Sequence, residues 1–217
     1  YCLQQEISNI REDKMKYLYT LLILALIFFP IEALCSNHEV NTEMPAVSKY
    51  QVATIQYKST RYKKEQNTSD LLALCKEAAE NDAKVIVTPE LGITGYPWLN
   101  RKEISSEVET VPGPTTNLFS KVSKNEGVYI VFSLPEVDPK TYLYYNTAVL
   151  VGPKGYVGKY RKTHSWVCEP RWAADGNLGF KVFGTKYGSL APLLCMDWDC
   201  IETARSVTFM YADFILY

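Results

Sequence analysis

The fold is decided by residues 85–90, which read Val85-Ile86-Val87-Thr88-Pro89-Glu90. The first three residues form a continuous apolar run, which is typical of a short strand buried on both faces. Pro89 cannot donate a hydrogen bond to a sheet, so the strand ends there and Glu90 lies at its carboxyl end. The stretch therefore predicts a buried strand with a carboxylate at its tip.

The segments around this strand predict the start of an α/β fold. Residues 50–57 have the pattern of a strand, and the apolar positions from Leu71 to Ala78 follow a helical period near 3.6. We expect Thr68 or Ser69 to cap that helix. Strand, helix and strand in this order are typical of a β-α-β unit.

The rest of the chain continues the alternation and adds a hairpin. Further helices are predicted at residues 115–124 and 200–211, and further strands at residues 128–134, 144–151, 156–160, 180–185, 190–194 and 213–217. A tight turn, Gly152-Pro153-Lys154-Gly155, joins two of these strands directly, so we expect a mixed sheet. The last strand-like run reaches the final residue, and we therefore expect a domain that is truncated at its C-terminus.

Composition predicts an ordinary globular domain. The 217 residues include 47% hydrophobic and 22% charged side chains, with 23 basic against 24 acidic groups. No basic stripe stands out, so nucleic acid is not an expected partner. No cysteine spacing matches a zinc site.

The first 48 residues are predicted to lie outside the domain. Residues 17–31 are apolar and uncharged and follow Lys16, but the run is shorter than the ~20 residues that a membrane-spanning helix needs. We expect residues 1–14 to be upstream read-through, residues 15–36 a signal peptide, residues 37–48 a linker and residues 49–217 the domain. The protein would then be secreted or periplasmic, with transient membrane contact through the leader. The alternative is an uncleaved anchor formed by Leu18–Ile31.

Three reactive side chains follow three of the predicted strands. Glu90 comes after residues 85–87, Lys162 after residues 156–160, and Cys195 after residues 190–194. Sites in α/β proteins form at the carboxyl ends of strands, so we expect these side chains to converge.

The neighbours of these side chains form three motifs. They read Thr88-Pro89-Glu90-Leu91-Gly92-Ile93-Thr94-Gly95-Tyr96-Pro97, then Gly158-Lys159-Tyr160-Arg161-Lys162-Thr163-His164 with Glu169-Pro170 beyond, then Leu194-Cys195-Met196-Asp197 with Glu202 and Arg205 beyond. In this order and spacing they resemble the three motifs of the nitrilase superfamily of carbon–nitrogen hydrolases. The resemblance covers residues 50–217.

The resemblance implies a fold and a set of roles. The fold would be an α-β-β-α sandwich, here incomplete at the C-terminus, and the full-length protein would be a homo-oligomer without metal or organic cofactor. Cys195 would be the nucleophile, Lys162 the oxyanion partner and Glu90 the general base. Glu169 would orient Lys162 and the substrate, and the backbone N–H of Met196 would be the second oxyanion donor.

The physical chemistry of these groups fits such roles. A thiol with an ordinary pKa near ~8.5 is mostly protonated at neutral pH, so it needs an adjacent base. A lysine can stabilise the anion that develops when the thiolate attacks an amide or a nitrile. Cys195-Met196-Asp197 resembles the amidase-like branches more than the true nitrilases, which carry Cys-Trp-Glu there. We therefore expect hydrolysis of a small amide, with a nitrile substrate or an inactive, non-catalytic fragment as alternatives.

Several other residues have an ordinary interpretation. We expect His164 to be structural, and Trp198, Cys168 and Cys200 to be points where the chain departs from the family pattern. A disulfide between Cys195 and Cys200 is conceivable and would silence the enzyme. Asn67-Thr68-Ser69 is either a glycosylation sequon of an exported chain or, as we favour, an ordinary helix cap.

Overall fold

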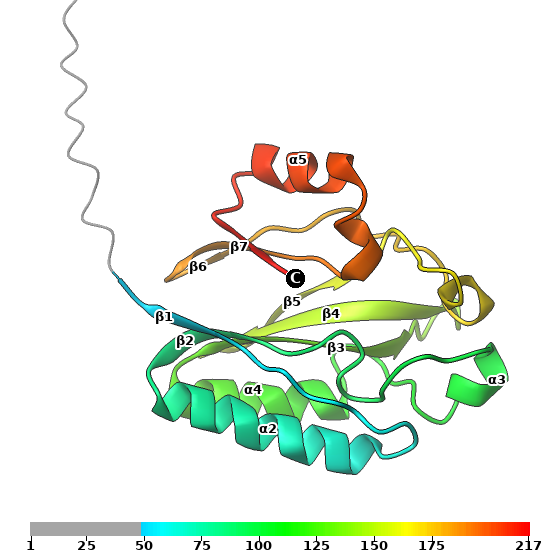
Figure 1. The fold of residues 1–217 in the computed structure, drawn as a ribbon, viewed down its shortest axis with the longest axis horizontal. Coiled ribbons are helices and arrows are strands. Elements are labelled where there is room, and N and C mark those ends of the chain that lie inside the picture. The colour runs from blue at the N-terminus through cyan, green and yellow to red at the C-terminus, as the bar shows by residue number, and fades with distance from the viewer. Residues whose placement is uncertain (1–48) are drawn as a thin grey trace, which may run out of the picture. The chain divides into compact units, whose positions relative to one another are not determined.

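The computed structural model describes residues 49–217, which form two sheets and the helices that cover them (Figure 1). The larger sheet has the order β1-β2-β3-β4-β5 and the smaller one the order β6-β7-β8. The strands of the larger sheet are β1 (Gln51–Thr54), β2 (Ala83–Val87), β3 (Tyr129–Val137), β4 (Tyr144–Gly152) and β5 (Gly155–Arg161). Those of the smaller sheet are β6 (Phe183–Thr185), β7 (Gly188–Pro192) and β8 (Phe214–Leu216).

The larger sheet is mixed, as the sequence predicts. Strands β1, β2 and β3 are parallel, while β3, β4 and β5 run antiparallel to their neighbours. The predicted hairpin joins β4 to β5, with Gly152 paired to Gly155. Gly155 has φ +103°, a backbone conformation that only glycine adopts readily.

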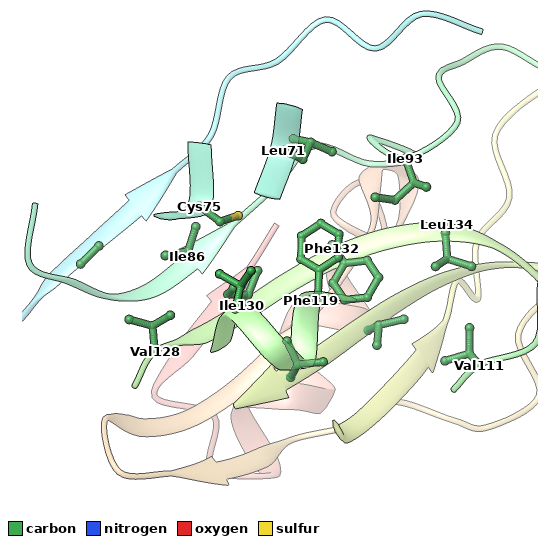
Figure 2. Close-up of a cluster of buried hydrophobic side chains, with 14 residues drawn as sticks. Leu71, Cys75, Ile86, Ile93, Val111, Phe119, Val128, Ile130, Phe132 and Leu134 are labelled. Atoms are coloured by element: carbon green, nitrogen blue, oxygen red, sulfur yellow. The ribbon is translucent and has the colours of Figure 1, made fainter. Parts of the chain in front are cut away.

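Two helices cover one face of the larger sheet, α2 (Lys64–Glu80) and α4 (Pro114–Glu126). Between them and the sheet lies an apolar core that Figure 2 shows, in which Phe119 of α4 stacks on Phe132 of β3 with ring centroids 4.1 Å apart. Leu71 and Ile130 are also fully buried there. Burying each such side chain contributes roughly 1.5–3 kcal/mol, so this core is a main source of stability.

The opposite face of the larger sheet packs against the smaller sheet. Val131, Ala148 and Leu150 meet Leu190 and Leu193 in a second core between the two sheets. Helix α5 (Ile201–Phe209) covers the outer side of the smaller sheet (Figure 1). The layers are therefore helix, sheet, sheet and helix, and the predicted α-β-β-α architecture is confirmed.

Helix α2 begins earlier than predicted, at Lys64 rather than after Thr68 or Ser69. Thr68 lies inside the helix and its hydroxyl donates to the carbonyl of Lys64 at 2.7 Å. Asn67 is 1% exposed, and its amide nitrogen donates to the carbonyls of Thr60 and Ile93. The helix-cap interpretation is therefore wrong, and the buried Asn67 amide leaves no room for a glycan on the folded domain.

Smaller differences concern strand ends. Strand β6 starts at Phe183 rather than residue 180, because β7 offers partners only from Gly188 to Leu190. Strand β7 ends at Pro192, so Cys195 lies in a separate 3-10 turn, η3 (Cys195–Asp197). Two short helical segments were not predicted, α3 (Arg101–Ile104) and η2 (Glu169–Arg171).

The predictions for the leader, the signal peptide and the linker fall on residues 1–48, outside the described residues. Within residues 49–217, no helix is both long enough and apolar enough to cross a membrane.

Candidate active site

Glu90 lies in the loop that follows β2, at the carboxyl end of that strand. The loop turns sharply, since Leu91 has φ +47°, and the Leu91 backbone N–H donates to the hydroxyl of Ser133 on β3. This anchor fixes the loop on the sheet face that meets the smaller sheet. The Glu90 side chain is 23% exposed and is therefore accessible to a ligand.

Lys162 comes directly after β5, and its backbone N–H donates to the carbonyl of Asn146 at 2.8 Å. Its ammonium group lies between two carboxylates, at 2.8 Å from Glu90 Oε1 and 2.6 Å from Glu169 Oε2. Only 2% of the Lys162 side chain is exposed. Burial opposes the charge on Lys162, but Glu90 and Glu169 outweigh it and raise its pKa above the ordinary lysine value. Lys162 is therefore a cation at neutral pH.

Glu169 begins the turn η2 and is fully buried. Besides the Lys162 ammonium, its Oε2 accepts from the backbone N–H of Trp166 at 2.6 Å. Its Oε1 accepts from the side-chain amide of Asn146 at 2.6 Å. A buried carboxylate with three donors is held in one position.

Asn146 on β4 belongs to this cluster, although sequence reasoning missed it. Its amide nitrogen donates to Glu169 and also to Glu90 Oε1 at 2.7 Å. The available signal was an amide side chain, Asn146, in a buried strand that continues with the apolar run from Ala148 to Val151. Glu90, Lys162, Glu169 and Asn146 thus form one connected cluster that three strands and two loops bring together.

Cys195 begins the turn η3 with φ +42°, a strained conformation for a residue other than glycine. The strain is held by Asp197, which is fully buried and accepts from the backbone N–H groups of Leu194 and His164 at 3.1 and 3.0 Å. The hydroxyl of Tyr160 also donates to Asp197 at 2.9 Å. The loop that carries Cys195 is therefore tied to the loop that carries Lys162.

Cys195 and Glu90 line the same cavity, which has a volume of about 270 Å³. Most of its other walls are apolar, including Leu194, Leu216 and the aromatic ring of Tyr217. Glu90 therefore presents one face to Lys162 and another to the cavity that Cys195 shares. Such an apolar cavity with a few polar groups is typical of a small-molecule site.

The thiol of Cys195 is neutral in this environment at pH 7. Burial raises the pKa of Cys195 above its ordinary value, and the negative charge of Glu90 raises it further. Lys162 and the backbone N–H of Met196 act in the opposite direction. A reaction at Cys195 therefore needs a base, and the carboxylate of Glu90 is the group in the cavity that can accept the proton.

The remaining polar candidates lie apart from this cluster. The ring of His164 contacts Asp197, with 3.1 Å between Nδ1 and Oδ1, so it supports the turn that carries Cys195. Cys75, Cys168, Cys195 and Cys200 all carry free thiols, and the conceivable Cys195–Cys200 disulfide is absent from the described residues. Residues 49–217 contain no group of three or more side chains placed to hold a metal ion.

Comparison with known proteins shows the family to which the chain belongs. The family model for carbon-nitrogen hydrolases matches residues 51–217. A nitrilase of Pyrococcus abyssi (strain GE5 / Orsay) is 36% identical over 167 residues, which are 76% of this chain and 63% of that protein. A formamidase of Bacillus cereus (strain B4264) is 39% identical over 137 residues, 61% of this chain and 40% of that protein.

Solved structures share the fold. Nit3 of Saccharomyces cerevisiae, a member of branch 10 of the nitrilase superfamily, has a TM-score of 0.64 at 23% identity, covering 76% of this chain and 60% of that one. An N-terminal amidase has a TM-score of 0.60 at 23% identity, covering 69% of this chain and 40% of that one. The chain belongs to the carbon–nitrogen hydrolase family, within the nitrilase superfamily. It spans less than two thirds of the length of the curated relatives named above.

Proposed function

We propose that the protein hydrolyses a small amide to a carboxylic acid and ammonia or an amine, through a thioester on Cys195. The observation that carries the proposal is the position of Glu90, which contacts the Lys162 ammonium and lines the cavity that holds Cys195. Glu90 therefore connects the Lys162 ammonium to the small, mostly apolar cavity that Cys195 lines.

The first half of the reaction forms the thioester. Glu90 takes the proton of the Cys195 thiol, and the sulfur attacks the amide carbonyl carbon. The oxygen anion that develops is stabilised by the Lys162 ammonium and by the backbone N–H of Met196. The carbon–nitrogen bond then breaks, and the proton held by Glu90 leaves with the ammonia or amine.

The second half returns the enzyme to its starting state. Glu90 takes a proton from water, and the resulting hydroxide attacks the thioester carbon. The carbon–sulfur bond breaks, the carboxylic acid is released, and the proton returns to the Cys195 sulfur. Throughout both halves, Glu169 holds Lys162 from the opposite side, so the ammonium stays in place while Glu90 changes its charge.

A nitrile is the second candidate substrate. The likeness to a nitrilase of Pyrococcus abyssi supports it, whereas Cys195-Met196-Asp197 and the likeness to a formamidase support an amide. We place the amide first, because the motif around the nucleophile bears directly on the reaction.

A substrate panel on the full-length protein tests the proposal. Small aliphatic amides and the matching nitriles are incubated with the protein, and ammonia release is measured. We expect turnover of amides, its loss in Cys195→Ala, and its retention in the matched variant Cys200→Ser. Turnover by Cys195→Ala at the wild-type rate would refute the role of Cys195, and a preference for nitriles would establish the second candidate.

A further inference from the structure

We propose that Asn146 is a positioning residue that holds the carboxylates of Glu90 and Glu169 on either side of Lys162 by donating a hydrogen bond to each. The inference rests on the proposed function for the roles of Glu90 and Lys162. The geometry that carries it stands independently of any substrate.

Asn146 contacts every charged member of the cluster. Its amide nitrogen donates to Glu90 Oε1 at 2.7 Å and to Glu169 Oε1 at 2.6 Å, so each of its two N–H groups serves one carboxylate. Its backbone carbonyl accepts from the N–H of Lys162 at 2.8 Å. The residue is 2% exposed and is part of strand β4, so it is a rigid support.

The charges explain why a neutral donor is needed here. Two carboxylates share one ammonium, which leaves one uncompensated negative charge in a poorly solvated place. Carboxylates held so close take up a proton more readily, because a proton relieves their repulsion. A base that is already protonated cannot accept the proton of Cys195. The amide of Asn146 stabilises both carboxylates by hydrogen bonds and adds no charge of its own.

The orientation of the Asn146 amide leaves its side-chain oxygen unpaired. With the nitrogen directed at the carboxylates, the side-chain oxygen of Asn146 is buried without a hydrogen-bond partner among the described residues. The flipped amide would place that oxygen against two negative groups, which is worse. A buried amide kept with an unpaired oxygen indicates that donation to the two carboxylates is what the position requires.

Other titratable groups also face the cluster. The Cys195 thiol on η3 and the hydroxyls of Tyr96 and Tyr217 all interact electrostatically with Glu90. The thiol of Cys168 lies 3.0 Å from the Tyr96 hydroxyl. The pKa values of Cys195, Tyr96 and Tyr217 all lie above their ordinary values, so these three groups are neutral at pH 5–7.

Two variants test the inference. Asn146→Ala removes the donor, and Asn146→Asp replaces it by a carboxyl group of the same size. For Asn146→Ala we expect kcat to fall roughly 10–100-fold with KM little changed, as when a residue that supports a catalytic group is removed. The acid limb of the kcat/KM profile should move to higher pH. Asn146→Asp should move it further, since a third carboxylate joins the cluster.

The matched control is Asn67→Ala. Asn67 is an equally buried asparagine whose amide donates to two backbone carbonyls, those of Thr60 and Ile93, and makes no hydrogen bond to the four side chains of the cluster. We expect it to lower Tm and to leave the pH profile of the folded enzyme in place. The inference is overturned if the Asn146 variants keep the wild-type profile, or lose activity only in proportion to unfolded protein. Failure of both variants to fold would also overturn it, because Asn146 would then be a structural residue.

A substrate-free measurement separates this inference from the proposed function. The rate at which iodoacetamide alkylates Cys195 is followed from pH 4 to pH 8 by peptide mass spectrometry. We expect its acid limb to vanish in Glu90→Gln and to move to higher pH in Asn146→Ala. If Glu90→Gln leaves the limb in place, the base of the proposed function is wrong. If Glu90→Gln removes it but Asn146→Ala does not move it, only the inference about Asn146 is wrong.

Discussion

At the scale of single residues, the proposed reaction requires Lys162 to be both charged and immobile. Its side chain is 2% exposed, and it is held by one carboxylate that is accessible and one that is fully buried. Burial of such a charge is costly unless it is paired, and here it is paired twice. The arrangement places a fixed cation against Glu90, which lines the cavity together with Cys195.

Replacing Lys162 by methionine tests this dependence. Lys162→Met removes the charge at similar size, and we expect turnover to fall by ~10²–10³, as for the loss of one donor to a developing anion. The circular dichroism spectrum should keep its folded form.

A second substitution separates catalysis from stability. Lys162→Met leaves Glu169 buried opposite Glu90 without a cation, so we expect Tm to fall as well. Adding Glu169→Gln removes the buried carboxylate that has lost its cation. The double variant should recover part of the lost Tm and none of the activity. Near wild-type turnover in Lys162→Met would exclude Lys162 from the reaction.

At the scale of elements, strands β3, β4 and β5 carry two polar clusters on opposite faces. Asn146 and Lys162 face the smaller sheet, whereas Glu136 and Arg161 face the helices, because neighbouring residues of a strand point to opposite sides. Glu136 is fully buried and contacts Lys159 at 2.5 Å and Arg161 at 2.5 Å. This second cluster fixes the ends of the strands that the site uses.

The Glu136 cluster predicts how stability depends on pH. Burial raises the pKa of Glu136, but hydrogen bonds from Arg161 and Lys159 outweigh it and hold that pKa below the ordinary glutamate value. The stabilisation is therefore complete above the unfolded pKa of about 4.3 and is lost as the pH falls through the lower folded value.

We expect Glu136→Gln to reduce the free energy of unfolding at pH 7 by about 3 kcal/mol, the lower end for breaking a buried ion pair, because Arg161 keeps Asp138. Urea unfolding at pH 7 and pH 3 measures it. The difference in the free energy of unfolding between wild type and Glu136→Gln should be smaller at pH 3 than at pH 7. A difference of equal size at pH 7 and pH 3 would contradict the claim that the charge of Glu136 provides the stabilisation.

Sequence patterns predict elements better than they predict contacts between them. The apolar runs of β2 and β4 could be predicted because both strands are buried, and the turn at residues 152–155 could be predicted from its glycines and proline. The prediction ended β3 at Leu134, yet β3 continues to Val137 through Pro135. The pairing of β3 with β2 ends at Val131. Pro135 lies beyond that point, so its missing N–H removes no hydrogen bond between β3 and β2.

Contacts between distant segments also limited the prediction of the site. Glu90, Lys162, Cys195 and Glu169 were named from motifs, and the structure brings Glu90, Lys162 and Glu169 into direct contact. Asn146 was missed, because its role depends on the face of β4 that meets two distant loops. No local pattern contains that information.

At the scale of the whole molecule, residues 49–217 form a four-layer domain, and residues 15–36 have the sequence pattern of a leader. We propose that the leader directs export, since residues 17–31 are apolar and lie behind Lys16. Export would place the free thiol of Cys195 in an oxidising compartment, where its partly buried position limits its reactivity.

N-terminal sequencing of the protein from its native host tests export. We expect a mature N-terminus near Ala33–Ser36, outside the cytoplasm. An N-terminus at Met15 in the membrane fraction would indicate the anchored alternative. A cytosolic product that starts near Ala46 would rule out export.

The central claim is that Cys195 carries the acyl group during turnover. The most direct measurement is rapid acid quenching of the full-length protein during turnover of an amide, followed by peptide mass spectrometry. We predict an acyl adduct on the peptide that contains Cys195, labile to hydroxylamine and absent from Cys195→Ala. Turnover without any adduct on Cys195, or with the acyl group on another residue, would contradict the account.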